Sequence, residues 1–214
     1  MSGASGDLAI GGLEPLTTLD YPGKLAAVIF CQGCAWNCRY CHNAHLREFR
    51  RPGTIAWTTI RDFLEERVGF LEAVVFSGGE PLAQRALPLA LEESKCLGYL
   101  AGLHTAGIYP ERLIACLPFL DWIGLDIKAP LDKRYDLVTG VRNSAKGILR
   151  SLEVVLASGL AFQIRTTWDR EVLSEGDMEE IDDVLRSYGA PPTIRQVCRR
   201  GDVYAQGGGA LIGT

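Results

Sequence analysis

The stretch AAVIFCQGCAWNCRYC, residues 26–41, joins a short apolar run to a group of cysteines. Residues 26–30 have the length and composition of a buried β-strand. The cysteines that follow within eleven residues are Cys31, Cys34, Cys38 and Cys41. Clustered thiols in a reducing compartment indicate a metal or redox site. The stretch therefore predicts a strand that leads directly into a reactive loop.

Other cysteines lie far from this group. Cys96, Cys116 and Cys198 are isolated, and we interpret them as small buried hydrophobes. The total of seven is odd and does not suit a secreted disulfide framework.

Apolar runs like the first recur along the chain, and segments with helical spacing separate them. The further predicted strands are 73–76, 99–103, 122–126, 161–166 and 193–198, all read as buried. The predicted helices are 60–68, 87–94, 110–117, 148–156 and 178–188. Ser174 with Asp177 suits a helix start, and Gly159 and Gly189 suit left-handed C-terminal caps.

Alternating strands and helices predict an α/β fold with a parallel sheet and right-handed crossovers. Closed barrels of eight units usually need about 250 residues. This chain has 214, so we expect a partial (β/α)6 barrel that is open on one side. We assign residues 1–201 to a single domain and the glycine-rich residues 202–214 to a flexible tail.

The charge and hydropathy patterns limit the partners. The formal net charge is −4 with Lys and Arg scattered, so nucleic acid is not expected as a partner. No apolar run reaches the 18 or more residues that span a bilayer, and residues 1–12 lack the features of a signal peptide. We therefore expect a cytoplasmic protein without a membrane partner.

Polar and unusual residues follow each predicted strand. In parallel α/β folds the carboxyl ends of the strands share one face, so these residues are expected to form one site. They come from the cysteine loop, from residues 77–81 and 104–107, and from the strand ends at 126–128 and 165–167.

Three thiols, Cys34, Cys38 and Cys41, suit a metal centre because soft sulfur ligands hold zinc or iron–sulfur clusters. A structural zinc site needs a fourth ligand, which His42, His45 or Cys31 could supply. Cys31 and Cys34 also have the spacing of a thiol redox pair, although such a pair ordinarily opens a helix.

The three-cysteine pattern with Tyr40 before the last cysteine resembles the signature of the radical S-adenosylmethionine (SAM) enzymes. The resemblance implies that Cys34, Cys38 and Cys41 bind one [4Fe-4S] cluster and are the catalytic cysteines, and that SAM binds its fourth iron. Gly78, Gly79 and Glu80 resemble the segment of this family that meets the methionine group of SAM.

Further likenesses extend the expected SAM site. Asp126 and Lys128 resemble the segment of glycyl-radical activating enzymes that meets the ribose and carboxylate of SAM, with a surface ion pair as the alternative. The resemblance also assigns Tyr40, Thr105 and Arg165 to the cofactor pocket. His104 stands where this resemblance leads us to expect an acidic residue, and Arg165 could instead pair with Asp126.

Three stretches resemble the activating proteins of anaerobic ribonucleoside-triphosphate reductases, namely residues 19–23, 41–43 and 135–140. Residues 42–79 contain no cysteine, so a second, ferredoxin-like cluster is not expected. Alternatives are an activase of the pyruvate formate-lyase type, a small-molecule enzyme of the 7-carboxy-7-deazaguanine synthase type, and a zinc-stabilised binding module.

The resemblance implies a reaction and its partners. An electron from flavodoxin or ferredoxin would reduce the cluster, and SAM would be cleaved to methionine and a 5′-deoxyadenosyl radical. That radical would take a hydrogen atom from a glycine of the reductase, which is the protein substrate.

Overall fold

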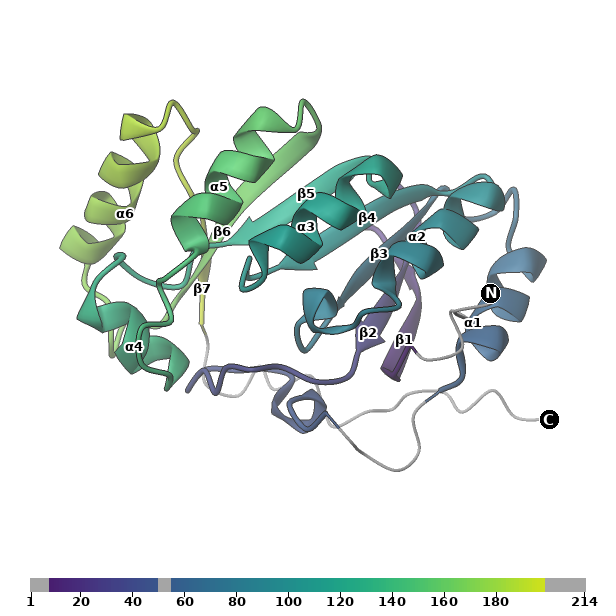
Figure 1. Ribbon diagram of the computed structural model, residues 1–214, viewed down its shortest axis with the longest axis horizontal. Helices are drawn as coiled ribbons and strands as arrows, with labels where there is room; N and C mark the ends of the chain where they lie inside the picture. Colours follow the sequence, from purple (N-terminus) through teal and green to yellow (C-terminus); the bar gives the residue numbers. More distant parts are fainter. Residues whose placement is uncertain (1–7, 50–54, 199–214) are drawn as a thin grey trace.

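Seven strands follow one another across a single sheet in chain order (Figure 1). The computed structural model describes residues 8–49 and 55–198. The strands are β1 (Ile10–Thr17), β2 (Ala26–Cys31), β3 (Ala73–Gly78), β4 (Leu100–Thr105), β5 (Trp122–Asp126), β6 (Ala161–Trp168) and β7 (Ile194–Val197). β1 is antiparallel to β2, and all other neighbouring pairs are parallel.

Helices connect the parallel strands. They are α1 (Trp57–Glu66), α2 (Leu87–Cys96), α3 (Pro110–Cys116), α4 (Lys133–Thr139), α5 (Ile148–Ala157) and α6 (Glu175–Ser187). Short 3-10 turns lie at Ala44–Leu46, Pro81–Ala83 and Leu117–Phe119. Because crossovers between parallel strands are right-handed, the helices gather on one side of the sheet (Figure 1).

Residues that alternate along the strands divide the core in two. Ala27 and Ile29 of β2 pack with the helices in the large core, whereas Ala26 and Val28 face the other side. On that inner, concave side a small cluster includes Tyr21 and Trp122, whose ring centroids lie 5.6 Å apart. The inner face is therefore filled by side chains at the amino ends of the strands and polar toward their carboxyl ends.

The partial (β/α)6 barrel is confirmed by this sheet, since six parallel strands β2–β7 with helical crossovers are present. Within the described residues, β1 and β7 form the two edges and do not pair with each other, so the barrel is open. Ser174 and Asp177 form a capping box at α6. Gly159 and Gly189 both have a φ of 72°, which confirms the left-handed caps.

Two elements were missed by the sequence analysis. β1 contains two glycines and Pro15, which disfavour a strand, and irregular register marks its pairing with β2. The short helix α4 has few residues to show a period, and its start is capped by the side chain of Asp132.

The prediction of a buried last strand is wrong. All four residues of β7 are exposed, because this strand is an edge of the sheet and no described strand pairs with its outer side. The predicted tail, 202–214, and residues 1–7 lie outside the described residues. In the described part of the chain, no helix has the length and apolarity to cross a membrane.

Candidate active site

The carboxyl ends of β2 to β6 bring the predicted residues to one edge of the sheet. The cysteine loop follows β2, Glu80 follows β3, Thr105 ends β4, Asp126 ends β5, and Arg165 lies on β6 beside Asp126. Contacts between these strands, described below, join the residues into one connected site. The convergence expected from a parallel sheet is thus present.

The cysteine loop is held on both sides by backbone hydrogen bonds. Gly33 and Cys34 donate to the carbonyls of Leu46 and Arg47, at 2.7 and 3.0 Å. On the other side, Asn37 N–H donates to the carbonyl of Thr139 at 2.8 Å, at the end of α4. The missed helix α4 therefore supports the loop directly.

Aromatic packing strengthens this support. Trp36 is buried and packs edge-on against Tyr135 of α4, with ring centroids 5.6 Å apart. The Tyr135 hydroxyl in turn accepts a hydrogen bond from the Lys128 backbone N–H at 3.2 Å. The Trp36 ring therefore covers a hydrophobic surface between the cysteine loop and α4.

The three predicted ligand cysteines are partly buried free thiols. The pKa of the Cys34 thiol is raised to about 12, mainly by burial, with smaller contributions from Glu80, Cys38 and Cys41. Burial also raises the pKa of Cys38, whereas the charge of Lys128 lowers it. The amide N–H of Trp36 donates to Cys34 Sγ at 3.4 Å. Buried thiols close to one another lose their protons more readily when a cation is bound, because the cation stabilises the thiolates.

A single zinc ion is the alternative considered for these cysteines. Within residues 8–49 and 55–198, no three His, Cys, Asp or Glu side chains are grouped as ligands of one metal ion. His42 and His45, considered as a fourth zinc ligand, are exposed, and Cys31 is buried in strand β2. In a cluster, by contrast, cysteines bind separate irons and stand farther apart.

Tyr40 carries a buried polar atom without a partner. Its hydroxyl oxygen is inaccessible and makes no hydrogen bond to any described residue. Lys128 and Cys38 are close enough for their charges to affect its pKa, which burial raises. An unsatisfied hydroxyl costs free energy, so this position suits a site that receives a polar ligand.

Gly78 and Gly79 permit a close approach of backbone to backbone. A Cβ on Gly78, whose φ is 111°, would lie 2.5 Å from the Cys31 nitrogen, and one on Gly79 would lie 2.4 Å from the Gly33 oxygen. Hydrogen bonds join the segments, from Gly79 N–H to Cys31 O at 2.9 Å and from Glu80 N–H to Gly33 O at 2.8 Å. These glycines fasten the turn after β3 to the start of the cysteine loop.

Glu80 is buried and accepts three hydrogen bonds within the protein. Thr105 Oγ1 and Leu82 N–H donate to Oε1 at 2.6 and 3.0 Å, and Ala106 N–H donates to Oε2 at 2.9 Å. Burial raises the pKa of Glu80, and these hydrogen bonds oppose the rise. Thr105 supports the carboxylate, and Oε2 keeps capacity for another donor.

Asp126, Lys128 and Arg165 form a largely buried charge network. Lys128 Nζ donates to Asp126 Oδ2 at 2.9 Å, and Arg165 Nε donates to Oδ1 at 3.0 Å. Burial alone would raise the pKa of Asp126, but Arg165 and Lys128 outweigh it and hold that pKa well below its usual range. The side chains of Lys128 and Arg165 are only 13% and 12% exposed, so the surface ion pair considered for Asp126 and Lys128 is excluded.

The residues present fit an iron–sulfur cluster and a charged organic ligand. Three thiols supply the soft donors, while Glu80 and Asp126 supply anionic acceptors and Lys128 and Arg165 supply cations. Sequence reasoning missed Trp122 on the inner face, and it met Asp20, Tyr135 and Gly140 only through a family resemblance. No local pattern marks these four residues, because their roles arise from contacts between distant segments.

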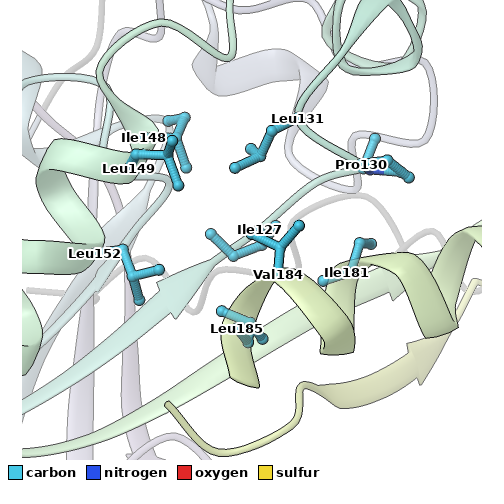
Figure 2. A pocket seen from close by; sticks show the side chains of 10 residues that line it. Ile127, Pro130, Leu131, Ile148, Leu149, Leu152, Ile181, Val184 and Leu185 are labelled. Atoms are coloured by element: carbon cyan, nitrogen blue, oxygen red, sulfur yellow. The ribbon is translucent and has the colours of Figure 1, made fainter. Parts of the chain in front are cut away.

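Two hollows lie near these elements, and they differ in character. The narrow apolar one between α5 and α6, lined by Ile127, Leu152 and Leu185 among others, has a volume of about 10 Å³ (Figure 2). It has room for about one water, and its walls are apolar. It is therefore too small for a cofactor. The other has a volume of about 330 Å³ and lies beside the cysteine loop. It is lined by Arg39, Tyr40, Asp169, Arg170, Glu171 and Cys198.

Comparison with known proteins finds similar chains. The profile of the Radical SAM superfamily matches residues 28–195. A Methanocaldococcus jannaschii protein named as a glycyl-radical enzyme activating enzyme is 31% identical over 186 residues, which cover 83% of this chain and 75% of the relative. The pyruvate formate-lyase-activating enzyme of Streptococcus mutans is 26% identical over 204 residues, covering 89% and 74% of the two chains.

Solved structures share the fold at low sequence identity. SuiB of Streptococcus suis bound to its precursor peptide SuiA has a TM-score of 0.66 at 16% identity. The match covers 81% of this chain and 39% of the solved one. The enzyme anSMEcpe, solved with bound AdoMet, has a TM-score of 0.61 at 15% identity, covering 78% and 49% of the two chains. This chain therefore spans less than half of either solved protein.

Proposed function

Because the chain belongs to the radical SAM superfamily, and within it to the glycyl-radical enzyme activating enzymes, we propose that it activates an anaerobic ribonucleoside-triphosphate reductase. The family uses a [4Fe-4S] cluster and SAM. When bound, they supply reductive cleavage of a carbon–sulfur bond and removal of a hydrogen atom from a glycine of the partner. The protein supplies the binding groups, their orientation and exclusion of water.

The assignment of residues follows from the site. Cys34, Cys38 and Cys41 would hold the cluster through the loop that α4 and Leu46 support. Glu80 keeps acceptor capacity on Oε2 for the ammonium of SAM, and Gly78 and Gly79 set its position. Asp126, Lys128 and Arg165 would meet the polar groups of the ligand, and the unpartnered Tyr40 hydroxyl faces the same region.

The choice of partner rests on where two stretches with the reductase-activase resemblance lie. In the stretch 19–23, the Asp20 carbonyl accepts a hydrogen bond from His104, and Tyr21 packs on Trp122. In the stretch 135–140, Tyr135 supports Lys128, and Gly140 lies against Asn37 of the cysteine loop. Both stretches support the site, and this placement is the observation that carries the proposal.

The test measures the partner radical directly. The cluster-loaded protein would be reduced with dithionite, or with flavodoxin or ferredoxin as proposed donors, and mixed with SAM and the reductase of the same source. We expect an electron paramagnetic resonance doublet that collapses when the glycine α-carbon of the reductase is deuterated. SAM cleavage without a radical on that reductase would contradict the proposal.

A pyruvate formate-lyase type of partner is the second candidate, favoured by the 26% identity to the Streptococcus mutans activating enzyme. The same experiment with such a lyase distinguishes the two. A doublet only on the lyase would keep the chemistry and correct the partner. The Cys38→Ser variant, mixed with either partner, is the control for signals that do not need the cluster.

A further inference from the structure

A line of polar contacts crosses the inner face of the sheet, from the loop after β1 to the carboxyl end of β5. His104 Nε2 lies 2.9 Å from the Asp20 carbonyl oxygen. Arg165 NH1 lies 3.4 Å from His104 Nδ1 and 3.2 Å from Nε2. The same guanidinium reaches Asp126, with NH2 2.9 Å from Oδ1. His104 therefore joins a backbone carbonyl to the charge network of the site.

Gly124 makes this line possible. His104 pairs with Gly124 across β4 and β5, whereas Arg165 pairs with Asp126 across β5 and β6. Arg165 must therefore pass diagonally over Gly124 to reach His104. A Cβ at position 124 would lie 3.0 Å from Arg165 Cζ, 3.1 Å from His104 Cδ2 and 2.8 Å from the Trp122 ring. The missing side chain leaves room that these three groups fill.

The contacts also define the hydrogen-bonding state of His104. A carbonyl oxygen can only accept, so Nε2 carries the proton that is donated to Asp20. A protonated Nε2 cannot accept from Arg165 NH1, although these two atoms lie 3.2 Å apart, so Nδ1, at 3.4 Å, is the ring nitrogen that can accept from this guanidinium. The ring is 10% exposed and packs edge-on against Trp122, with centroids 5.3 Å apart. A neutral imidazole held at both nitrogens can restrain the flexible arginine.

We propose that His104 is a positioning residue for SAM binding, which fixes Arg165 against Asp126 so that the Asp126 carboxylate keeps its direction. The proposal rests on the proposed role of Asp126 in binding SAM, and it is independent of which glycyl-radical enzyme is the partner. Without His104, the Arg165 side chain loses its only described restraint on NH1. Its contact with Asp126 would then vary in direction.

The experiment compares three variants by anaerobic calorimetry with SAM on the cluster-loaded protein. In His104→Leu both polar contacts are lost, and we expect Kd to rise roughly tenfold or more. In His104→Gln the amide keeps a donor and an acceptor, and we expect Kd within about threefold of the unchanged protein. Tyr99→Phe, the control, removes a buried hydrogen bond from the Tyr99 hydroxyl to the Leu64 carbonyl but none of the described polar contacts of the line, so Kd should not change.

Thermal unfolding of each variant separates positioning from stability. Tyr99→Phe should lower Tm without changing Kd, whereas His104→Leu should change both. The proposal is overturned if His104→Leu binds SAM as tightly as the unchanged protein, if His104→Gln binds as weakly as His104→Leu, or if Tyr99→Phe raises Kd as much as His104→Leu does.

A further variant covers the case in which His104→Leu does not fold or load its cluster. Arg165→Lys can keep a charge pair with Asp126, but one ammonium cannot span both Asp126 and His104, so Kd should again rise roughly tenfold. An unchanged Kd would overturn the proposal. SAM cleavage by the unchanged protein with dithionite tests the proposed function separately. Failure of the proposed function can thus be distinguished from failure of the proposed role of His104.

Discussion

At the scale of single residues, Cys34, Cys38 and Cys41 differ from the other cysteines in their surroundings. They lie on one loop, where Cys38 is close enough to Lys128 for its charge to lower the cysteine pKa, whereas Cys31 is buried in β2. Cys96 is exposed on α2, so its interpretation as a buried hydrophobe is wrong. A thiolate beside a cation is a better ligand than a thiol enclosed in an apolar core. These surroundings support the proposed ligand set.

We predict that Cys34→Ser, Cys38→Ser or Cys41→Ser each abolishes the visible absorption of the cluster, because a serine oxygen is too hard a ligand for iron–sulfur chemistry. Cys96→Ser is the matched control on the surface, and Cys31→Ala is the control in the core. Iron and sulfide analysis after anaerobic reconstitution measures the result. Complete cluster loss in either control would show that the ligand set is wrong.

His104 gives a second prediction, on the pH dependence of stability. Burial and the charge of Arg165 lower the pKa of His104 to about 4, despite Asp20 and Asp126 nearby. A histidine with a depressed pKa stabilises the fold above its unfolded pKa of about 6.5, and this contribution is lost as the pH falls.

Between pH 6.5 and 4 the loss should be on the order of 3 kcal/mol. We expect His104→Gln, which does not titrate, to show a flatter pH dependence of unfolding free energy in this range. Urea unfolding of both proteins, without the cluster, measures it. Parallel curves for the two proteins would mean that His104 is not held neutral.

At the scale of elements, helix α4 determines the place of the cysteine loop. Its last turn accepts hydrogen bonds from Asn37 and Arg39, and Gly140 follows with a φ of 68°. A Cβ on Gly140 would lie 3.1 Å from the Asn37 oxygen. The loop and the end of the helix are thus in direct backbone contact.

We predict that Gly140→Ala weakens cluster binding, whereas Gly159→Ala does not. Both glycines have left-handed backbone, so each change should cost about 1–2 kcal/mol of stability. The two positions differ in the space around an added Cβ, because a Cβ on Gly159 would meet nothing within 4 Å. Urea unfolding should show similar losses, and reconstitution should show reduced iron content in Gly140→Ala alone. Equal iron content in both variants would contradict a role of α4 in holding the loop.

At the scale of the whole molecule, the open sheet leaves one edge with little protection. β7 is four residues long and all of its residues are exposed, whereas β3 and β5 are largely buried between other strands. Opening of a region that buries little apolar surface costs little free energy. The open edge is therefore expected to fluctuate more than the centre.

We predict that backbone amides of β7 exchange with solvent far faster than those of β3 and β5, which should exchange only through global unfolding. Hydrogen exchange followed by mass spectrometry measures this on the full chain. Protection of β7 equal to that of β5 would show that the edge is covered in solution.

Much of the fold could be predicted because apolar runs and helical spacing are local patterns. The six parallel strands, the helices between them and the caps at Gly159 and Gly189 all come from residues close together in the sequence. β1 and α4 were missed because Pro15 and short length obscure their patterns. Burial of β7 was mispredicted because an edge position depends on the whole sheet.

The site, like the fold, has some features that follow from local sequence and others that depend on tertiary contacts. The sequence by itself determined the cysteine loop, the turn after β3 and the charged residues at the ends of β5 and β6, because these are contiguous motifs placed by a parallel sheet. Only the tertiary structure decided that Glu80 is held by Thr105, that α4 supports the cysteine loop, and that His104 meets Arg165 across Gly124. Contacts between side chains on different strands depend on register and available space, which no local pattern contains.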